Sequence, residues 1–444
     1  MRIFVIGAGD VGSTVVESLH AAHELTVVDV DGERLAALAH RFDVRVSKGH
    51  GASRRLLQEA EIGGAELVIA CTSRDETNIV AALVARSLAP GAKTIVRTTN
   101  VEYLEVWHQN QLDVDFIVCE ELEIAIAVSQ LVGLPAARQT DVFADGQVQV
   151  VEFDVEEGAA RARPDVIGKP LREASLPPRA RVAAIIRQGR MLPPFGGESI
   201  EEGDRVIIVG APEAARAWSE VLARDTRRVE EAVIVGCAGT GVAIAHVLLD
   251  QGIDVTLVEA NAVRAREVAE LLPAARVLNA SGLDADFLQR ERLGLARLGV
   301  VALEDKSKSL YAAVLLKRAG VAFTIAAVQD PHTTEIFLAA GVDVAISPRS
   351  LVAEEIVRFA HDPRTQQVTM LEGDRFEILD ITCRTESALV GKPLRELPVT
   401  GSFVGAIVRD GTAIIPHGSD VLQPGDRAIL FTESKRAVEV EQAL

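Results

Sequence analysis

The sequence predicts an α/β protein in which two doubly wound, mostly parallel sheets are each followed by a small α+β domain. Three observations predict this class. Short runs of Val and Ile alternate with helical segments, a glycine-rich turn follows the first strand of each large unit, and the unit that turns at Gly7 turns again at Gly236.

The first large unit opens with a strand, a sharp turn and a helix. Ile3 to Ile6 are a β-branched and aromatic run, typical of a buried parallel strand. In the turn that follows, the first glycine allows the tight bend, the second admits a pyrophosphate, and the third lets the helix pack on the strand. Free amides and the helix dipole face the phosphates. The predicted phosphate-binding residues are Gly7, Ala8, Gly9, Asp10, Val11 and Gly12.

Asp29 ends the next predicted strand, Leu25 to Val28, where its carboxylate is placed to accept hydrogen bonds from a ribose diol. The same carboxylate disfavours a 2′-phosphate, so the pattern favours NAD over NADP. Adenosine, ADP and ATP carry the same diol. We therefore expect a Rossmann-like site for an adenine nucleotide; the alternative is a turn that keeps its glycines for packing and binds no ligand.

The first unit continues with a helix from Asp31 to about residue 40 and four further strands, near residues 44–46, 67–70, 94–96 and 116–118. Polar residues follow the fourth and fifth of the unit's strands, at the sheet edge where ligands bind. The candidates there are Thr72, Asp75, Asn78 and Arg97. Two alternatives stay open: the polar loop residues only cap the next helix, or Arg97 only pairs with a surface acid.

The first small unit begins near Thr140. Residues 148–155 alternate like strands at an exposed edge, and Gly168 to Arg172 predict a turn leading into a short helix. Residues 182–187 and 205–209 predict two more strands, the second after a Gly203-Asp204 turn. Such a module has little room for a deep catalytic pocket. Its glycine turns are expected to be structural, and Asp204, which follows a glycine, is expected to be ordinary turn chemistry.

Both units then repeat. The second glycine turn and its acid supply the candidates Gly236, Gly241 and Glu259, but Ala238 replaces the middle glycine. Leu303, Lys306, Ser309 and Ala327 stand where the first copy has Thr72, Asp75, Asn78 and Arg97. We therefore expect the second pocket to be weakened, altered or empty. The small unit recurs in residues 391–395, 403–408 and 424–430, and the predicted domains are 1–120, 139–223, 230–347 and 367–444.

Composition narrows the function. Hydrophobic residues make up 48% of the 444 but aromatics only 4%, as expected of sheets and helices packed with Val, Ile, Leu and Ala. A formal net charge of -18, with no basic stripe, argues against nucleic-acid binding. Without a signal peptide or membrane-spanning run, a cytoplasmic protein is expected. The four Cys residues lack metal-ligand spacing and are expected to be buried free thiols, and no metal site is predicted.

With this order of units laid out, the sequence strongly resembles the TrkA family, the peripheral NAD-binding subunits of Trk-type potassium uptake systems, which pair RCK N-terminal (KTN) and RCK C-terminal domains. The most specific segments are IGAGDVG with VVDVD, CTSRDETN, the GKPLRE turns and PGDRAILF. The resemblance implies nucleotide contacts at Gly7, Gly9, Gly12, Asp29, Thr72 and Arg97. It also implies a cytoplasmic subunit that gates a membrane-embedded, TrkH-like potassium translocating subunit, as a homotetramer or dimer of dimers.

In some relatives an acidic residue after the sixth strand has a divalent-cation role, within a Ser-Pro-Glu turn. Here the two copies read Cys119-Glu120-Glu121 and Ser347-Pro348-Arg349, so that role is not expected.

Two other functions compete with a gating subunit that binds NAD or NADH, and also ADP or ATP. An NAD-dependent oxidoreductase would need an acid–base residue beside the nicotinamide, and the small domains offer no such constellation. A regulator of another cation transporter or antiporter would usually have one large and one small unit. We therefore expect no catalytic residues and favour the Trk-type regulator.

Overall fold

The computed structural model describes residues 1–144, 146–188, 190–192, 194–223, 228–328, 330, 333–360, 365–371, 376–387, 389–396, 402–437 and 439–440. The chain divides into two compact units: Met1–Ser129 with Glu230–Ala360, and Gln130–Val229 with His361–Leu444. The first unit holds both α/β domains and the second holds both small domains.

The first α/β domain is a parallel sheet in the order β3-β2-β1-β4-β5-β6, with the reversal of strand order between β1 and β4. Its strands are β1 (Arg2–Ile6), β2 (Glu24–Asp29), β3 (Arg45–Lys48), β4 (Leu67–Ala70), β5 (Lys93–Thr98) and β6 (Phe116–Cys119). Its helices are α1 (Asp10–Leu19), α2 (Gly32–Arg41), α3 (Arg54–Glu59), α4 (Asp75–Leu88), α5 (Glu102–His108) and α6 (Glu120–Leu131). The predicted doubly wound topology is confirmed, with strand ends moved by one or two residues.

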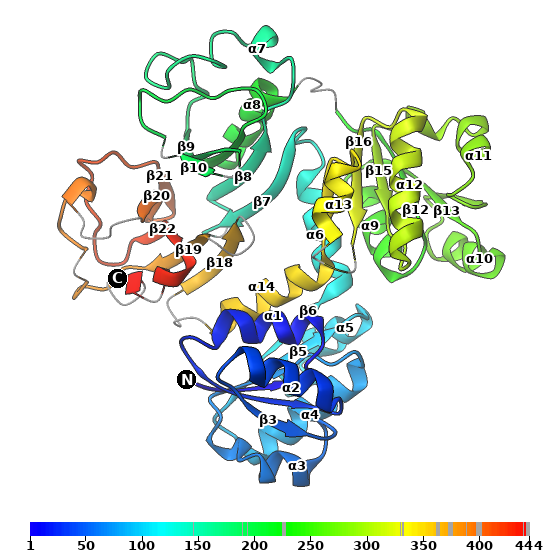
Figure 1. Cartoon of the computed structure of the whole chain (residues 1–444), viewed down its shortest axis with the longest axis vertical. Helices are drawn as coiled ribbons and strands as arrows, with labels where there is room; N and C mark the ends of the chain where they lie inside the picture. The colour runs from blue at the N-terminus through cyan, green and yellow to red at the C-terminus, as the bar shows by residue number, and fades with distance from the viewer. Residues whose placement is uncertain are drawn as a thin grey trace. The chain divides into compact units, whose positions relative to one another are not determined.

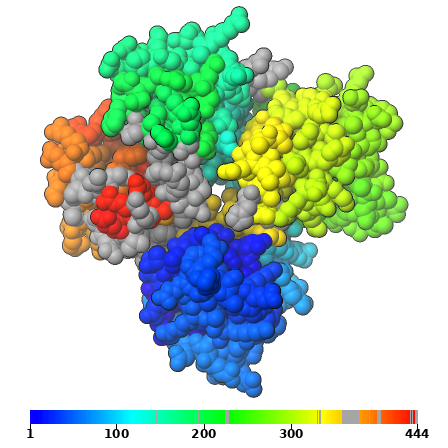
Figure 2. Space-filling view, in the orientation of Figure 1, coloured from blue at the N-terminus to red at the C-terminus, as the bar shows by residue number. Residues whose placement is uncertain are grey.

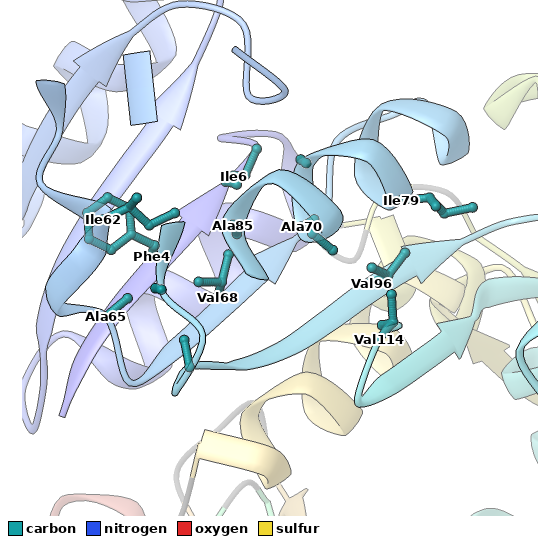
Figure 3. Close-up of a cluster of buried hydrophobic side chains, with 14 of the residues drawn as sticks. Phe4, Ile6, Ile62, Ala65, Val68, Ala70, Ile79, Ala85, Val96 and Val114 are labelled. Carbon is teal, nitrogen blue, oxygen red and sulfur yellow. The ribbon is translucent and has the colours of Figure 1, made fainter. Parts of the chain in front are cut away.

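The core of this domain lies between the sheet and helices such as α4. Val68 and Ala70 of β4 belong to the same buried cluster as Ala81, Ala82 and Ala85 of α4. Figure 3 labels Val68, Ala70 and Ala85 of this cluster. Three small side chains on one helix face let α4 lie close to the strands, and all three are fully buried. In the space-filling view the residues at the start of the chain are the blue atoms (Figure 2). The buried cluster joins α4 to the strand whose end carries part of the candidate site.

The second α/β domain repeats the same strand order, β14-β13-β12-β15-β16-β17. Its strands are β12 (Glu231–Val235), β13 (Asp254–Glu259), β14 (Arg276–Asn279), β15 (Leu298–Val301), β16 (Phe323–Ala327) and β17 (Val344–Ile346). Its helices are α9 (Gly239–Asp250), α10 (Ala262–Leu271), α11 (Ala285–Arg290), α12 (Lys306–Ala319), α13 (Thr334–Ala339) and α14 (Pro348–Ala360). The last helix, α14, packs against α1 of the first domain, as Figure 1 shows.

The first small domain is an antiparallel sheet in the order β10-β9-β11-β8-β7. Its elements are β7 (Ala137–Phe143), β8 (Val148–Asp154), α7 (Ala159–Ala162), β9 (Ala180–Arg187), β10 (Arg190–Leu192), β11 (Arg205–Gly210) and α8 (Pro212–Leu222). The prediction of an exposed edge at residues 148–155 is wrong, because β8 pairs with β7 on one side and β11 on the other. The predicted helix after Gly168-Arg172 is also wrong, since residues 171–178 hold only turns, a bend and irregular chain.

The second small domain has the equivalent order β18-β19-β22-β20-β21. Its strands are β18 (Thr365–Leu371), β19 (Phe376–Thr382), β20 (Phe403–Arg409), β21 (Thr412–Ile414) and β22 (Arg427–Glu433). Here the repeated turn does lead into one turn of 3₁₀ helix, Leu394–Glu396. One hydrophobic cluster includes Phe143 and Ile207 of the first small domain together with Ile378 and Ile429 of the second. The two small domains therefore share a core.

A buried aspartate that pairs with an arginine recurs at the same place in both small domains. Asp204 is 2% exposed and accepts hydrogen bonds from Nε and Nη2 of Arg187, both at 2.8 Å. Asp426, also 2% exposed, accepts from Nε and Nη2 of Arg409 at 2.8 and 2.7 Å. The Gly-Asp turn predicted as ordinary turn chemistry is thus an anchor that ties the turn to the neighbouring strand.

Replacing Asp204 with Asn is expected to destabilise the small domain by about 2 kcal/mol, because the Arg187 guanidinium loses its buried partner and keeps only the more exposed carboxylate of Glu201. Urea unfolding of the single variants and of the Asp204→Asn, Arg187→Met double variant measures this coupling. Additive effects of the two substitutions would contradict the assigned role.

Candidate functional site

The first glycine turn is held by backbone contacts at two of its three glycines. Gly7 has φ of +118°, and a Cβ there would lie 2.8 Å from the backbone nitrogen of Thr72. A Cβ on Gly12 would lie 1.9 Å from the carbonyl oxygen of Gly7. Packing of the strand, the turn and the helix therefore explains both glycines.

Gly9 is different, because nothing in the protein fills the space beside it. A Cβ there would meet only Nη1 of Arg34, at 3.6 Å. Gly9 is also the N-cap of α1, and no side chain caps this helix end. The first-turn amides of a helix lack partners within the helix and carry its positive dipole end. The turn thus leaves an open place for an anion beside Gly9.

Asp29 is fixed against this turn at the end of β2. One carboxylate oxygen accepts the amide of Ala8 at 2.6 Å, and the other accepts the amide of Asp31 at 2.8 Å. A carboxylate oxygen can accept more than one hydrogen bond, so Asp29 is oriented without being saturated. It can still accept hydroxyl donors of a ligand.

A cavity of about 670 Å³ joins these features at the carboxyl edge of the sheet. This volume lies within the range of small-molecule sites. The cavity is lined by Gly9, Asp10, Val11, Val28, Asp29, Val30, Asp31, Arg34, Gly49, His50, Gly51, Cys71, Thr72, Ser73, Arg74, Thr77, Arg97 and Arg349. Of the predicted residues, Gly9, Asp10, Val11, Asp29, Thr72 and Arg97 line the cavity, whereas Gly7, Ala8, Gly12, Asp75 and Asn78 do not.

Asn78 and Asp75 do not line the cavity, but they support the loops that form its wall. Asn78 is fully buried, and its amide nitrogen donates to the carbonyl oxygens of Thr72 and Arg97 at 3.0 and 2.9 Å. Asp75 accepts from the hydroxyl of Thr98 at 2.8 Å and from the amides of residues 99 and 100. Both side chains connect the loops after β4 and β5, so they position the site. Arg74 is the N-cap residue of α4, and no side-chain hydrogen bond caps this helix.

Arg97 lies within β5, and its partner is a buried acid. Its Nε donates to Glu120 Oε2 at 3.1 Å, its Nη2 pairs with the same oxygen, and its Nη1 donates to the carbonyl oxygen of Thr72 at 2.9 Å. Arg97 and Glu120 are 8% and 7% exposed. The alternative of a surface acid is therefore wrong. The pair places a charge-balanced guanidinium at the edge of the cavity.

The site also contains residues that the sequence did not single out as ligand contacts. Arg34 follows Asp29 on α2, and Gly49 to Gly51 follow β3 at the same sheet edge; a count of strand ends would have found this loop. Arg349 comes from α14, more than 300 residues later, and only the folded chain shows it.

Burial suppresses the reactivity of three of the four cysteines. All four are buried and none forms a disulfide, as predicted. Burial raises the pKa of Cys71 and of Cys237 to about 12 and that of Cys119 to about 11. These thiols stay protonated at neutral pH and are poor nucleophiles.

The second copy keeps the backbone of the turn and differs at its surface. Gly236 has φ of +106°, a Cβ on Gly241 would lie 2.0 Å from the Gly236 carbonyl oxygen, and Glu259 accepts the amide of Cys237 at 3.1 Å. A cavity of about 570 Å³ touches Ala238, Gly239 and Thr240, but Gly236, Gly241 and Glu259 do not line it. It is also lined by Arg97, Thr99, Glu120, Glu121, Ala302, Leu303, Glu304, Lys306, Ala327 and Arg349.

Two family models each match the chain twice, in the order large domain, small domain, large domain, small domain. The family model of the TrkA-N domain matches residues 3–120 and 232–348, and that of the TrkA-C domain matches residues 161–223 and 378–444. In the described part of the chain, no helix has the length and apolar character needed to cross a membrane.

Curated relatives match from end to end. Trk system potassium uptake protein TrkA homolog 1 of Methanosarcina mazei is 30% identical, over 100% of this chain and 99% of the relative. Trk system potassium uptake protein TrkA of Vibrio alginolyticus is 28% identical, over 100% and 98%.

Solved structures share the fold. The crystal structure of the GsuK RCK domain has a TM-score of 0.61 at 18% identity, and covers 100% of this chain and 94% of the other. The structure of the GsuK channel bound to NAD has a TM-score of 0.61 at 17% identity, covering 100% and 78%.

The contrast between Gly9 and Gly12 can be tested by stability alone. Gly12→Ala is expected to lower the thermal midpoint of the first domain by about 5 °C or more, because its methyl overlaps a backbone oxygen. Gly9→Ala enters open space and is expected to change the free energy of unfolding by less than about 0.5 kcal/mol. Circular dichroism melting curves compare the two variants. Equal effects would contradict the view that Gly9 is free of packing constraints.

Proposed function

This chain belongs to the TrkA family of Trk system potassium uptake proteins. From that premise we propose that it is a cytoplasmic regulatory subunit, which binds adenine nucleotides and controls potassium transport. The observation that carries the proposal is the open space at Gly9, which faces the uncapped end of α1 and shares a cavity with Asp29.

The proposed ligand is NAD or NADH, with ADP and ATP as further ligands. Asp29 would accept the hydroxyls of the adenosine ribose, and the amides of the turn from Gly9 onward would bind the phosphates. Thr72 and Arg97 line the same cavity toward its far side. All of these ligands share the ribose diol and at least two phosphates, so they are expected to compete for one site. The NAD in the GsuK channel structure supports this choice.

The lining side chains favour binding over catalysis. Asp29 is held by two amides, the Arg97 charge is balanced by Glu120, and His50 Nδ1 accepts the amide of Ala52 at 3.2 Å. The Cys71 thiol is kept protonated by burial. Each titratable group named here already has a structural partner, which suits a site that senses its ligand and releases it unchanged.

Regulation requires a partner that conducts the ion, and we propose a membrane-embedded, TrkH-like potassium translocating subunit. The two α/β domains of one chain would join those of other copies in a homotetrameric ring at the cytoplasmic face of the membrane. A nucleotide shifts such a ring between states only by its differential affinity for them, typically about 1 to 3 kcal/mol per site. Several sites in one ring would add their effects.

Asp29→Ala is expected to weaken NADH, NAD, ADP and ATP alike, by about tenfold or more, because each ligand loses hydrogen bonds to the same carboxylate. Calorimetric titration measures the four affinities. Asp43→Ala, which removes an exposed acid, is the matched control, and melting curves check that the loss of the Asp29 hydrogen bonds has not unfolded the turn. Unchanged affinities in a folded Asp29→Ala protein would refute the proposed site.

Cells that lack the gene are expected to take up less potassium at low external concentration, and a plasmid copy should restore uptake. A plasmid copy that carries Asp29→Ala should also restore potassium uptake, but the rate of uptake should no longer depend on the nucleotide. Normal uptake in the deletion strain, grown with no second potassium system, would refute the regulatory role.

A further inference from the structure

The two α/β domains place equivalent residues of opposite charge at the start of their last helices. In the first domain, β6 is followed at once by Glu120 and Glu121, which begin α6. In the second, β17 is followed by Ser347, Pro348 and Arg349, and Pro348 begins α14. Glu121 and Arg349 are therefore counterparts in the repeat.

Arg349 reaches the phosphate end of the first cavity. Its guanidinium pairs with the carboxylate of Asp10, the first residue of α1, and α14 packs along α1 (Figure 1). The Arg349 side chain is 33% exposed and lines the cavity that holds Gly9 and Asp29. The second domain thus brings a cation to the helix end that is expected to bind phosphate.

Glu121 reaches the same place in the second domain. A Cβ built on Gly239 would lie 1.4 Å from Oε1 of Glu121, so the carboxylate rests directly on the first residue of α9. No side chain caps α9 at its N-cap, Ala238. The Glu121 carboxylate therefore lies against the start of α9, the end at which an anionic ligand of this turn would bind.

The electrostatic surroundings make this position unfavourable for a further negative charge. Burial, and then the nearby carboxylates of Glu120 and Asp75, raise the pKa of Glu121 to about 7, while Arg264 opposes the shift. The cations that line this cavity all have acidic partners: Arg97 pairs with Glu120, Lys306 with Asp330 at 2.6 Å, and Arg349 with Asp10 of the first domain. A phosphate would have to displace a carboxylate and then lie beside another.

We propose that this exchange of opposite charges sets the nucleotide stoichiometry at one per chain. Arg349 completes the phosphate end of the first site, and Glu121 closes the second turn to phosphates. The inference rests on the proposed nucleotide-binding function and assigns both residues a place in it: Arg349 contacts the phosphates, and Glu121 excludes them.

The Arg349 half is tested by comparing ADP with adenosine in calorimetric titrations of the full-length protein. Arg349→Glu is expected to weaken ADP by tenfold or more and to change the adenosine affinity by less than twofold, since only ADP carries phosphates. Arg318→Glu makes the same charge change at an exposed position of α12 and should leave both affinities unchanged. An equal loss for ADP and adenosine, or no loss of ADP, would overturn the role of Arg349.

The Glu121 half is tested by the number of ADP molecules bound per chain. The wild type and Ala238→Gly are expected to bind one, whereas Ala238→Gly combined with Glu121→Arg is expected to bind two. Melting curves confirm that each variant is folded. A second ADP in Ala238→Gly alone would assign the block to the Ala238 methyl, and a single ADP in the folded double variant would show that Glu121 does not exclude it. Either result overturns the inference.

These outcomes separate the inference from the function on which it rests. Failure of the wild type to bind any adenine nucleotide would refute the proposed function. Binding of two nucleotides by the wild type would keep that function and refute the stoichiometry.

Discussion

The hydrogen bond between the Ala8 amide and the Asp29 carboxylate is the contact on which the first site depends. It joins the turn after β1 to the end of β2, across the two strands that the parallel sheet places side by side. The close approach of Gly12 to the Gly7 carbonyl oxygen fixes the other side of the same turn. Only Gly9 is left without a packing partner. Gly7, Gly12 and Asp29 therefore hold the turn in a conformation that keeps the space beside Gly9 open.

Much of this could be predicted from sequence, because its signals are local. Strand ends, turn glycines and the acid after the second strand lie within thirty residues of one another, and periodicity gives their order. The interior position of β8 could not be predicted in this way. Its residues alternate, but β7, which pairs with it and buries it, carries Gln, Thr and Asp and gives a weak strand signal.

The site itself was harder to predict, for a physical reason. A polar residue at a strand end can face the ligand or the neighbouring loop, and spacing does not distinguish the two. Thr72, in the loop before α4, lines the cavity. Asn78, in the first turns of α4, instead donates to the carbonyl oxygens of Thr72 and Arg97. Arg349 depends on how α14 packs on α1, which no local pattern encodes. Tertiary packing therefore decides whether such a polar side chain contacts the ligand or a neighbouring loop.

The opposite charges of Glu121 and Arg349 bear on why two copies of the fold share one polypeptide. In a dimer of identical subunits with twofold symmetry, both halves must present the same residue to each other. A substitution that improved one phosphate position would be duplicated at the other. Once the copies are fused, each can mutate alone, and one half can evolve to hold the ligand while its twin becomes a fixed counterpart.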